Sequence, residues 1–187
     1  MPCNCSPSST YIAFLTDARR RGDEYAVLDW IPEHHDAVIA DAPLRYTTTA
    51  PTGRVHLRAF VEIDRATMSS ERLAAKLVSY ARLLDYTPTP PGRRSIGAAQ
   101  NSTRSWQKYC PLFPRVLFVI TNCGDLALAH RIADLRAMAT AHPRAAHLVG
   151  QVPADVARLE DLETHGPSAA VWTPLDGRER PCGWMGL

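Results

Sequence analysis

The sequence predicts an α/β domain, and three patterns lead to this prediction. Residues 55–64, VHLRAFVEID, alternate along two faces with a period of two, which indicates a strand. Residues 70–84 carry apolar side chains at helical spacing. Residues 114–122 form a continuous apolar run, which is typical of a strand buried on both faces.

The first half of the chain begins with a predicted helix that starts near Ser9 or Thr10 and ends at Gly22. Two strands are predicted next, over residues 24–31 and 34–41. Residues 42–54 contain Pro51 and Gly53, so we expect a turn or a ragged hairpin arm there. The strand over residues 55–64 follows.

The second half starts with the clearest helix, in which Leu73, Leu77, Tyr80 and Leu84 form the expected buried stripe. Hydrophobic periodicity, together with the positions of glycine and proline, predicts the remaining elements. They are a long loop over 87–105, the buried strand over 114–122, a helix over 125–142, a strand over 148–152, a helix over 156–166, and an extended tail or strand over 169–177.

Length and composition favour one folded unit. The chain has 187 residues, of which 45% are hydrophobic and 21% are charged, as in ordinary globular domains. We expect a flexible N-terminus over residues 1–9 and a single domain over 10–187, with a loop insertion at about 86–112. The net charge of +2 neither demands nor excludes nucleic acid as a partner.

The cysteines and the apolar segments predict a cytoplasmic protein. The five cysteines are odd in number and irregularly spaced, so reduced thiols are expected. Cys3 and Cys5 stand closer together than the usual zinc-binding pair. No stretch is apolar for the roughly 18 residues that a membrane helix needs, and the first residues do not resemble a signal peptide.

Three acidic residues occupy suggestive places on the predicted strands. Glu62 and Asp64 lie two positions apart near the end of one strand, so their side chains point to the same face. Asp36 opens the preceding strand, and it approaches them if the two strands pair as a hairpin. Clustered carboxylates suit Mg²⁺ or Mn²⁺, and we expect Asp36 and Glu62 to bind the ion.

Such a cluster suits hydrolysis of a phosphodiester. A divalent ion neutralises charge on the phosphate and lowers the pKa of a bound water. A nearby ammonium group stabilises the transition state. Lys76 is the only lysine between residues 1 and 107, and it lies one helical turn before Tyr80.

A purely structural role remains open for the same residues. Acidic groups at strand ends are often only solvated. Glu62 can pair with Arg58 on its own strand, and Asp64 can pair with Arg65 or Arg72. In that interpretation Lys76 is an ordinary surface lysine.

The stretch FVEIDRATMSSERLAAKLVSYARLL, residues 60–84, resembles the signature of the replication-relaxation family. Residues 114–122, 130–139 and 166–175 also look like the C-terminal half of that family. The resemblance implies an origin in actinobacterial plasmids or mobile elements. It also implies a restriction-endonuclease-like PD-(D/E)XK core, in which a central mixed sheet is flanked by helices.

The resemblance implies roles for individual residues. Asp36 matches the acid of the "PD" strand, with His35 in place of the usual proline, and Glu62 matches the acid of the (D/E)-x-K strand. Asp64 stands where the motif has lysine, and Lys76 takes the place of a lysine moved to the next helix. The implied activity is that of a Mg²⁺-dependent DNA endonuclease or nickase; the alternative is a nuclease fold that binds DNA or protein without cleaving.

DNA is the implied partner, together with a replication or mobile-element protein, and a homodimer formed through the last helix and tail is a further hypothesis. Family members usually carry an N-terminal winged helix, so this chain is expected to be a short form or a fragment. Seven basic residues are candidates for phosphate contacts. They are Arg19, Arg20, Arg21, Arg93, Arg94, Arg104 and Lys108. For the first three, the alternative is that they only complement the dipole of the helix that they end.

Overall fold

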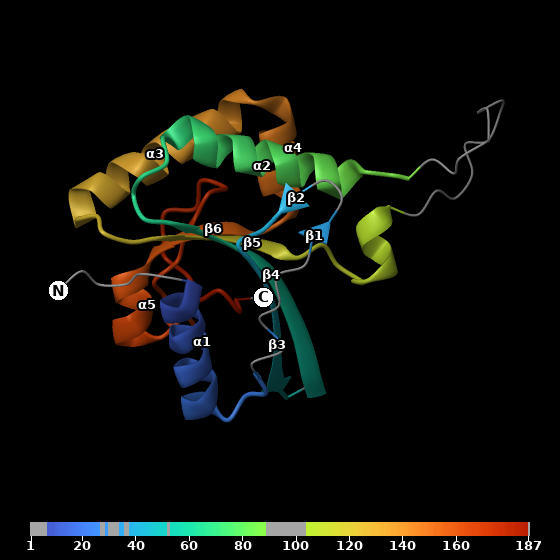
Figure 1. Ribbon diagram of the computed structural model, residues 1–187, viewed down its shortest axis with the longest axis vertical. Coiled ribbons are helices and arrows are strands. Elements are labelled where there is room, and N and C mark those ends of the chain that lie inside the picture. The colour runs from blue at the N-terminus through green and yellow to red at the C-terminus, as the bar shows by residue number, and fades with distance from the viewer. Residues whose placement is uncertain are drawn as a thin grey trace.

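The computed structural model describes residues 7–26, 29, 34–35, 38–51, 53–88 and 104–186. A mixed sheet with the order β3-β4-β5-β6-β7 forms the centre (Figure 1). Its strands are β3 (Ala42–Ala50), β4 (Gly53–Asp64), β5 (Arg115–Ile120), β6 (Ala154–Arg158) and β7 (Thr173–Pro174). The pairs β4–β5 and β5–β6 are parallel, while β3–β4 and β6–β7 are antiparallel. The predicted α/β class and the mixed sheet flanked by helices are therefore confirmed.

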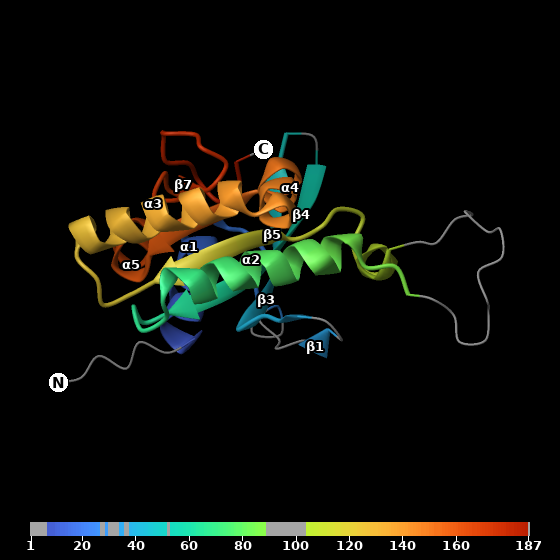
Figure 2. The same cartoon turned by 90° about the horizontal axis from the view of Figure 1, so that it is seen from above.

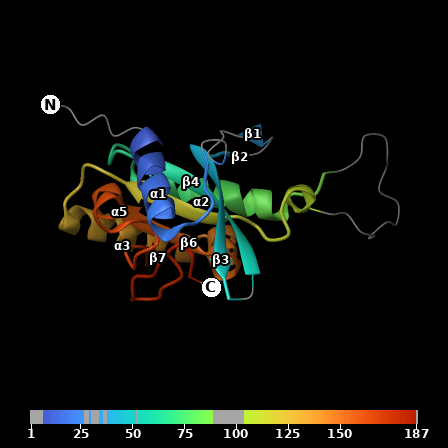
Figure 3. The ribbon, with the colours of Figure 1, turned by 90° about the horizontal axis from the view of Figure 1, so that it is seen from below.

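Helices cover both faces of this sheet. Seen from above, α2 (Ser70–Asp85), α3 (Asp125–Ala141) and α4 (Pro143–Gln151) lie over one face (Figure 2). Seen from below, α1 (Pro7–Arg21) and α5 (Leu159–His165) lie over the other (Figure 3). A short 3-10 helix, η2 (Ser105–Lys108), precedes β5.

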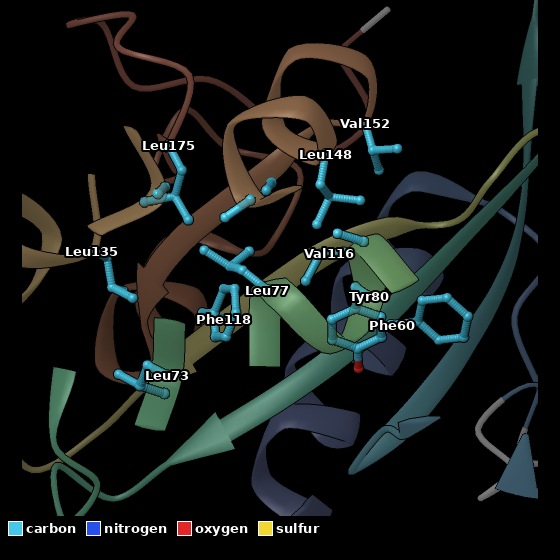
Figure 4. Packing of buried hydrophobic residues seen from close by; sticks show 14 of the residues in the cluster. Phe60, Leu73, Leu77, Tyr80, Val116, Phe118, Leu135, Leu148, Val152 and Leu175 are labelled. Atoms are coloured by element: carbon cyan, nitrogen blue, oxygen red, sulfur yellow. The ribbon is translucent and has the colours of Figure 1, made fainter. Parts of the chain in front are cut away.

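The alternation along β4 divides the interior into two cores. Phe60 faces α2 and packs with Leu73, Leu77 and Tyr80 (Figure 4). Leu57, Ala59 and Val61 face α1 and α5 instead, and they share a second core with Phe14, Trp172 and Trp184. The predicted period of two and the predicted stripe of α2 are thus confirmed, because each face of β4 buries the apolar residues that the pattern assigns to it.

The pairing of strands differs from the prediction in the first half of the chain. Residues 42–50, expected to be a turn or a ragged arm, form the regular strand β3, and this strand pairs with β4 along its whole length. Among the described residues of 34–41, β1 (His34–His35) and β2 (Val38–Ile39) pair with each other and not with β4. The hairpin between residues 34–41 and 55–64, on which the approach of Asp36 to Glu62 and Asp64 depends, is therefore not formed by these strands.

Three further predictions need correction. Of the strand expected over 24–31, the structure shows one isolated bridge, between Glu24 and Thr47; residues 27, 28, 30 and 31 lie outside the described ranges. Residues 148–151 belong to α4 rather than to a strand, and residues 156–158 belong to β6 rather than to a helix. Residues 148–152 form a short apolar run that suits a buried helix or a buried strand, and periodicity alone does not separate the two. The helix predicted over 156–166 is present as α5, but it begins only at Leu159, after the end of β6.

Across the part of the chain that the structure describes, no helix combines the length and the apolar character that crossing a membrane requires.

Candidate functional site

Glu62 lies near the end of β4 with its side chain only 1% exposed. The ammonium group of Lys76 donates a hydrogen bond to Oε2 of Glu62, and the two groups form an ion pair. The hydroxyl of Tyr80 donates to Oε1 at 2.5 Å. Both oxygens of a buried carboxylate are therefore engaged by donors from the same helix.

The sequence of α2 explains why these two donors arrive together. Lys76 and Tyr80 are four residues apart, so their side chains neighbour each other on the helix surface. Leu73 and Leu77 are fully buried and fix the rotation of the helix against the sheet. The ring of Tyr80 stacks on Phe60, with centroids 5.1 Å apart, which aims its hydroxyl along β4 toward Glu62.

A second carboxylate, that of Asp41, reaches the same ammonium group. Asp41 directly precedes β3, and its Oδ2 accepts a hydrogen bond from the backbone N–H of Ile63 at 2.8 Å. The same oxygen lies 3.8 Å from Nζ of Lys76. The side chains of Asp41 and Lys76 are 38% and 27% exposed, so the cluster opens to solvent on their side.

Sequence reasoning missed Asp41, although a signal was present. The turn at Pro51 pairs Ala50 with Gly53, and the same register pairs Ala42 with Val61. Extending this register by one residue sets Asp41 opposite Glu62. A hairpin drawn around this turn would have identified Asp41 as the acid of the neighbouring strand.

Burial dominates the electrostatics of this cluster. It raises the pKa of Glu62 to about 7, while the hydrogen bonds from Lys76 and Tyr80 act in the opposite direction and the charge of Asp41 adds to the rise. Burial also raises the pKa of Tyr80, and the Glu62 carboxylate raises it further. Tyr80 therefore stays protonated and acts as a donor near neutral pH.

Asp64 faces the same side of β4 but belongs to a different cluster. Its Oδ2 accepts from Nη1 of Arg131 at 2.9 Å, and its Oδ1 accepts from the backbone N–H groups of Thr67 and Met68, both at 3.1 Å. Arg131 also donates to the carbonyl oxygens of Ala66 and Met68. These contacts hold the β4–α2 connection, in which Ala66 has a φ of 58°.

The ion pairs that Glu62 and Asp64 form in the structure differ from those that the sequence suggested. Glu62 pairs with Lys76 instead of Arg58, so Lys76 is not an isolated surface lysine. Asp64 pairs with Arg131 instead of Arg65 or Arg72. The catalytic role expected for Asp64 stays a prediction, but its carboxylate is occupied by structural contacts.

The other candidate residues do not gather around Glu62. Arg20 pairs with Asp17 at 2.6 Å and Arg21 with Asp23 at 2.8 Å, and Arg19 is exposed beside them at the end of α1. This helix covers the face of the sheet opposite to α2.

At η2, Lys108 is exposed, and a guanidinium nitrogen of Arg104 lies 3.6 Å from Asp85. Asp36, Arg93 and Arg94 lie outside the described residues, so their places in the site stay predictions.

Within the described ranges, no group of three or more His, Cys, Asp or Glu side chains is arranged to hold a metal ion. The site therefore offers two carboxylates, from Asp41 and Glu62, around one ammonium group.

Residues 8–94 match the model of the replication-relaxation family. The matched segment contains the whole cluster of Asp41, Glu62, Lys76 and Tyr80, and it supports the resemblance stated for residues 60–84. The likeness predicted for the C-terminal half lies beyond the match and stays a prediction. No curated protein and no solved structure matches the chain.

Proposed function

We propose that the chain acts on DNA during the replication or relaxation of a plasmid or mobile element, as a metal-dependent endonuclease or nickase. The observation that carries this proposal is the convergence of Asp41, Glu62 and Lys76 at the end of an antiparallel strand pair. The family match over residues 8–94 supports DNA as the substrate. A nuclease core of the PD-(D/E)XK type is part of the proposal, with Asp41 in the position that sequence reasoning gave to Asp36.

The donor set fits Mg²⁺ or Mn²⁺. Mg²⁺ is usually bound through one or two carboxylates together with phosphate oxygens of the substrate, so a third protein carboxylate is not needed. Asp41 and Glu62 would hold the ion, because both already approach one cationic group, the ammonium of Lys76. When bound, such an ion neutralises charge on the phosphate and supplies a water of lowered pKa.

The protein's own groups have distinct parts in this proposal. Lys76 is partly exposed and pairs with both carboxylates, so its ammonium group can turn toward a phosphate oxygen and stabilise developing negative charge. Tyr80 orients Glu62 through its hydrogen bond and does not contact substrate, because it is fully buried. In the metal-free protein burial raises the pKa of Glu62 to about 7, so metal binding, which needs the carboxylate, and the cleavage that depends on it should increase as the pH rises through that value.

One observation favours a second candidate, a DNA-binding module that does not cleave. Both oxygens of Glu62 are already engaged, and the side chain is almost completely buried. If Lys76 keeps its ion pair in the presence of Mg²⁺, the cluster only joins α2 to β4. The chain would then bind DNA in a salt-dependent manner and leave it intact.

Nicking of supercoiled plasmid separates the two candidates. The protein is incubated with plasmid in Mg²⁺, in Mn²⁺ and in EDTA, beside Glu62→Gln and Asp41→Asn. The endonuclease proposal predicts metal-dependent nicking that falls on the order of 100-fold or more in both variants. Glu163→Gln is the matched control, because it makes the same chemical change on the exposed surface of α5.

The outcomes point to different conclusions. Nicking that persists in Glu62→Gln at the rate of Glu163→Gln contradicts the proposed site. Intact plasmid in every reaction, together with DNA binding by the unmodified protein, favours the module. Absence of DNA binding contradicts both candidates.

A further inference from the structure

The β3–β4 hairpin carries a ladder of basic and hydroxyl side chains on one of its faces. Register pairs Arg45 with Arg58, Thr47 with His56, and Thr49 with Arg54. These positions alternate with the apolar residues of both strands, so all six side chains point to the same face. We call this face the ribbon face; it consists of Arg45, Thr47, Thr49, Arg54, His56 and Arg58.

The two faces of the hairpin have different surroundings. Leu44, Tyr46 and Leu57 are buried on the side of α1. On the ribbon face, Arg45, Thr49, Arg54 and His56 are exposed, and Thr47 and Arg58 are partly exposed. Figure 1 shows the outer part of the hairpin leading away from α2, so this helix does not lie over it.

The ribbon face and the Glu62 cluster lie on the same face of β4, with the buried Phe60 between them. Glu62 and Arg58 are four residues apart on β4, so both side chains point to the same face at a separation of about 13 Å. Arg54 lies four residues farther toward the tip. The basic residues therefore lie between the tip of the hairpin and Phe60, and Lys76 lies beyond Phe60.

The charges on this face suit a polyanion. Arg45 and Arg58 lie directly opposite each other, so one phosphate group can contact both guanidinium groups. Arg54 is paired with Glu24, but both side chains are more than half exposed, and such a pair contributes little free energy, so a phosphate can compete for the arginine.

We propose that the ribbon face binds duplex DNA and that Arg45, Arg54 and Arg58 contact its phosphates. The shape supports a duplex as the partner, because the major groove admits a two-stranded β-ribbon. Thr47 Oγ1 and His56 Nδ1 hydrogen-bond to each other at 3.0 Å, and Nε2 of His56 and the hydroxyl of Thr49 can hydrogen-bond to phosphates or base edges. This inference rests on the proposed function and names the surface through which that function finds its substrate.

Binding measured without cleavage tests the ribbon face. Fluorescence anisotropy of a labelled DNA duplex is recorded in EDTA over a series of salt concentrations. The triple variant Arg45→Gln, Arg54→Gln, Arg58→Gln should bind at least about tenfold more weakly near 0.1 M salt, and the slope of log affinity against log salt should become shallower by about 2.7, or 0.9 for each lost contact. The control Arg144→Gln, Arg180→Gln changes exposed arginines of α4 and the C-terminal segment, and it should bind within twofold of the unmodified protein.

A second readout does not depend on the triple variant folding. A photo-crosslinking amino acid in place of Thr49 should crosslink to the duplex, and the same group in place of Glu163 should not. Equal affinity of the triple variant and the control, or crosslinking from position 163 but not from 49, overturns the inference. The plasmid assay reports separately on the site: a triple variant that binds normally while the unmodified protein still nicks plasmid refutes the ribbon face and leaves the endonuclease intact.

Discussion

Glu62 and Asp64 are two carboxylates on one strand, two residues apart and on one face, yet their surroundings differ. Asp64 accepts hydrogen bonds from an arginine and from two backbone N–H groups of the connection that follows it. Glu62 accepts from a lysine and a tyrosine, with a second carboxylate beside the lysine. Asp64 is thus held by a planar guanidinium group and by two backbone N–H groups. The main partner of Glu62 is instead a flexible, partly exposed ammonium group.

The difference teaches that strand position does not by itself give a carboxylate its role. A guanidinium that also binds two backbone carbonyl groups has little freedom to leave its carboxylate. Lysine is a point charge on a flexible chain, and it can move between two carboxylates and a ligand. We therefore expect Asp64 to serve stability and Glu62 to take part in the proposed chemistry, and four predictions test that division.

The largest expected effect is on the stability of Asp64→Ala. Removing this carboxylate leaves Arg131 with an uncompensated charge and leaves two backbone N–H groups without their acceptor, which should cost about 3–5 kcal/mol of unfolding free energy. Urea unfolding measures the change. Asp64→Asn keeps an acceptor for the N–H groups and should lose less. A cost below about 1 kcal/mol for Asp64→Ala would contradict the structural role of Asp64.

Glu62→Gln should change how stability depends on pH. Burial raises the pKa of Glu62 to about 7 in the folded protein from its ordinary value of 4.5, so the folded state binds this proton more tightly than the unfolded state. The stabilisation that Glu62 contributes is therefore fully present at a pH below its pKa in the unfolded state. It is lost as the pH rises through about 7, by as much as about 3 kcal/mol. Urea unfolding at pH 5 and pH 8 measures the loss.

The comparison with the variant isolates Glu62 from the other titrating groups. A glutamine does not titrate, so the free energy of the unmodified protein should fall relative to that of Glu62→Gln between pH 5 and pH 8. Glu163→Gln is the control and should run parallel to the unmodified protein. Parallel behaviour of Glu62→Gln as well would show that burial does not raise the pKa of Glu62.

The sequence predicts the parts of this site that depend on local contacts and does not predict those that depend on contacts between residues far apart in the chain. Periodicity identified β4 and α2, and the spacing of Lys76 and Tyr80 placed both on one helical face, because these relations are local. The pairing of Asp64 with Arg131 joins residues far apart in sequence, and no local pattern indicates which arginine of many will reach a given acid. The sequence points to Asp36 because Pro51 and Gly53 indicate a turn or ragged arm over residues 42–54, which makes residues 34–41 the expected neighbour of β4.

The same reasoning explains the errors in the C-terminal half. Residues 148–152 form a short apolar segment that suits either a strand or one face of a helix. Pro143 at the first position of α4 and the acceptor on His142 favour a helix start there, and these capping signals distinguish the helix from a strand. The strand β6 contains Asp155, whose burial among apolar strands could not be read from its chemical type.

Tyr80→Phe tests the hydrogen-bonded side of Glu62 and should cost about 1–2 kcal/mol, because a buried carboxylate loses one of its donors. The ring keeps its stack on Phe60, so the packing contribution stays. Since the Tyr80 hydrogen bond lowers the pKa of Glu62, its loss should shift the fall in stability to higher pH. Urea unfolding across pH 5–9 detects both effects. Tyr86→Phe changes an exposed tyrosine and should leave both unchanged.

The smallest expected change in stability is that of Asp41→Asn. This variant tests directly whether Asp41 has a structural role like that of Asp64 or a chemical role beside Glu62. Asp41 is partly exposed, and an asparagine keeps an oxygen for the N–H group of Ile63, so the cost should stay below about 1 kcal/mol. Its negative charge raises the pKa of Glu62, so removing it should shift the fall in stability to lower pH, opposite to the shift from Tyr80→Phe. Unfolding curves over the same pH series measure both quantities. A cost of several kcal/mol would place Asp41 with Asp64 as a structural acid, whereas a small cost combined with a large loss of nicking would make it a residue retained for chemistry.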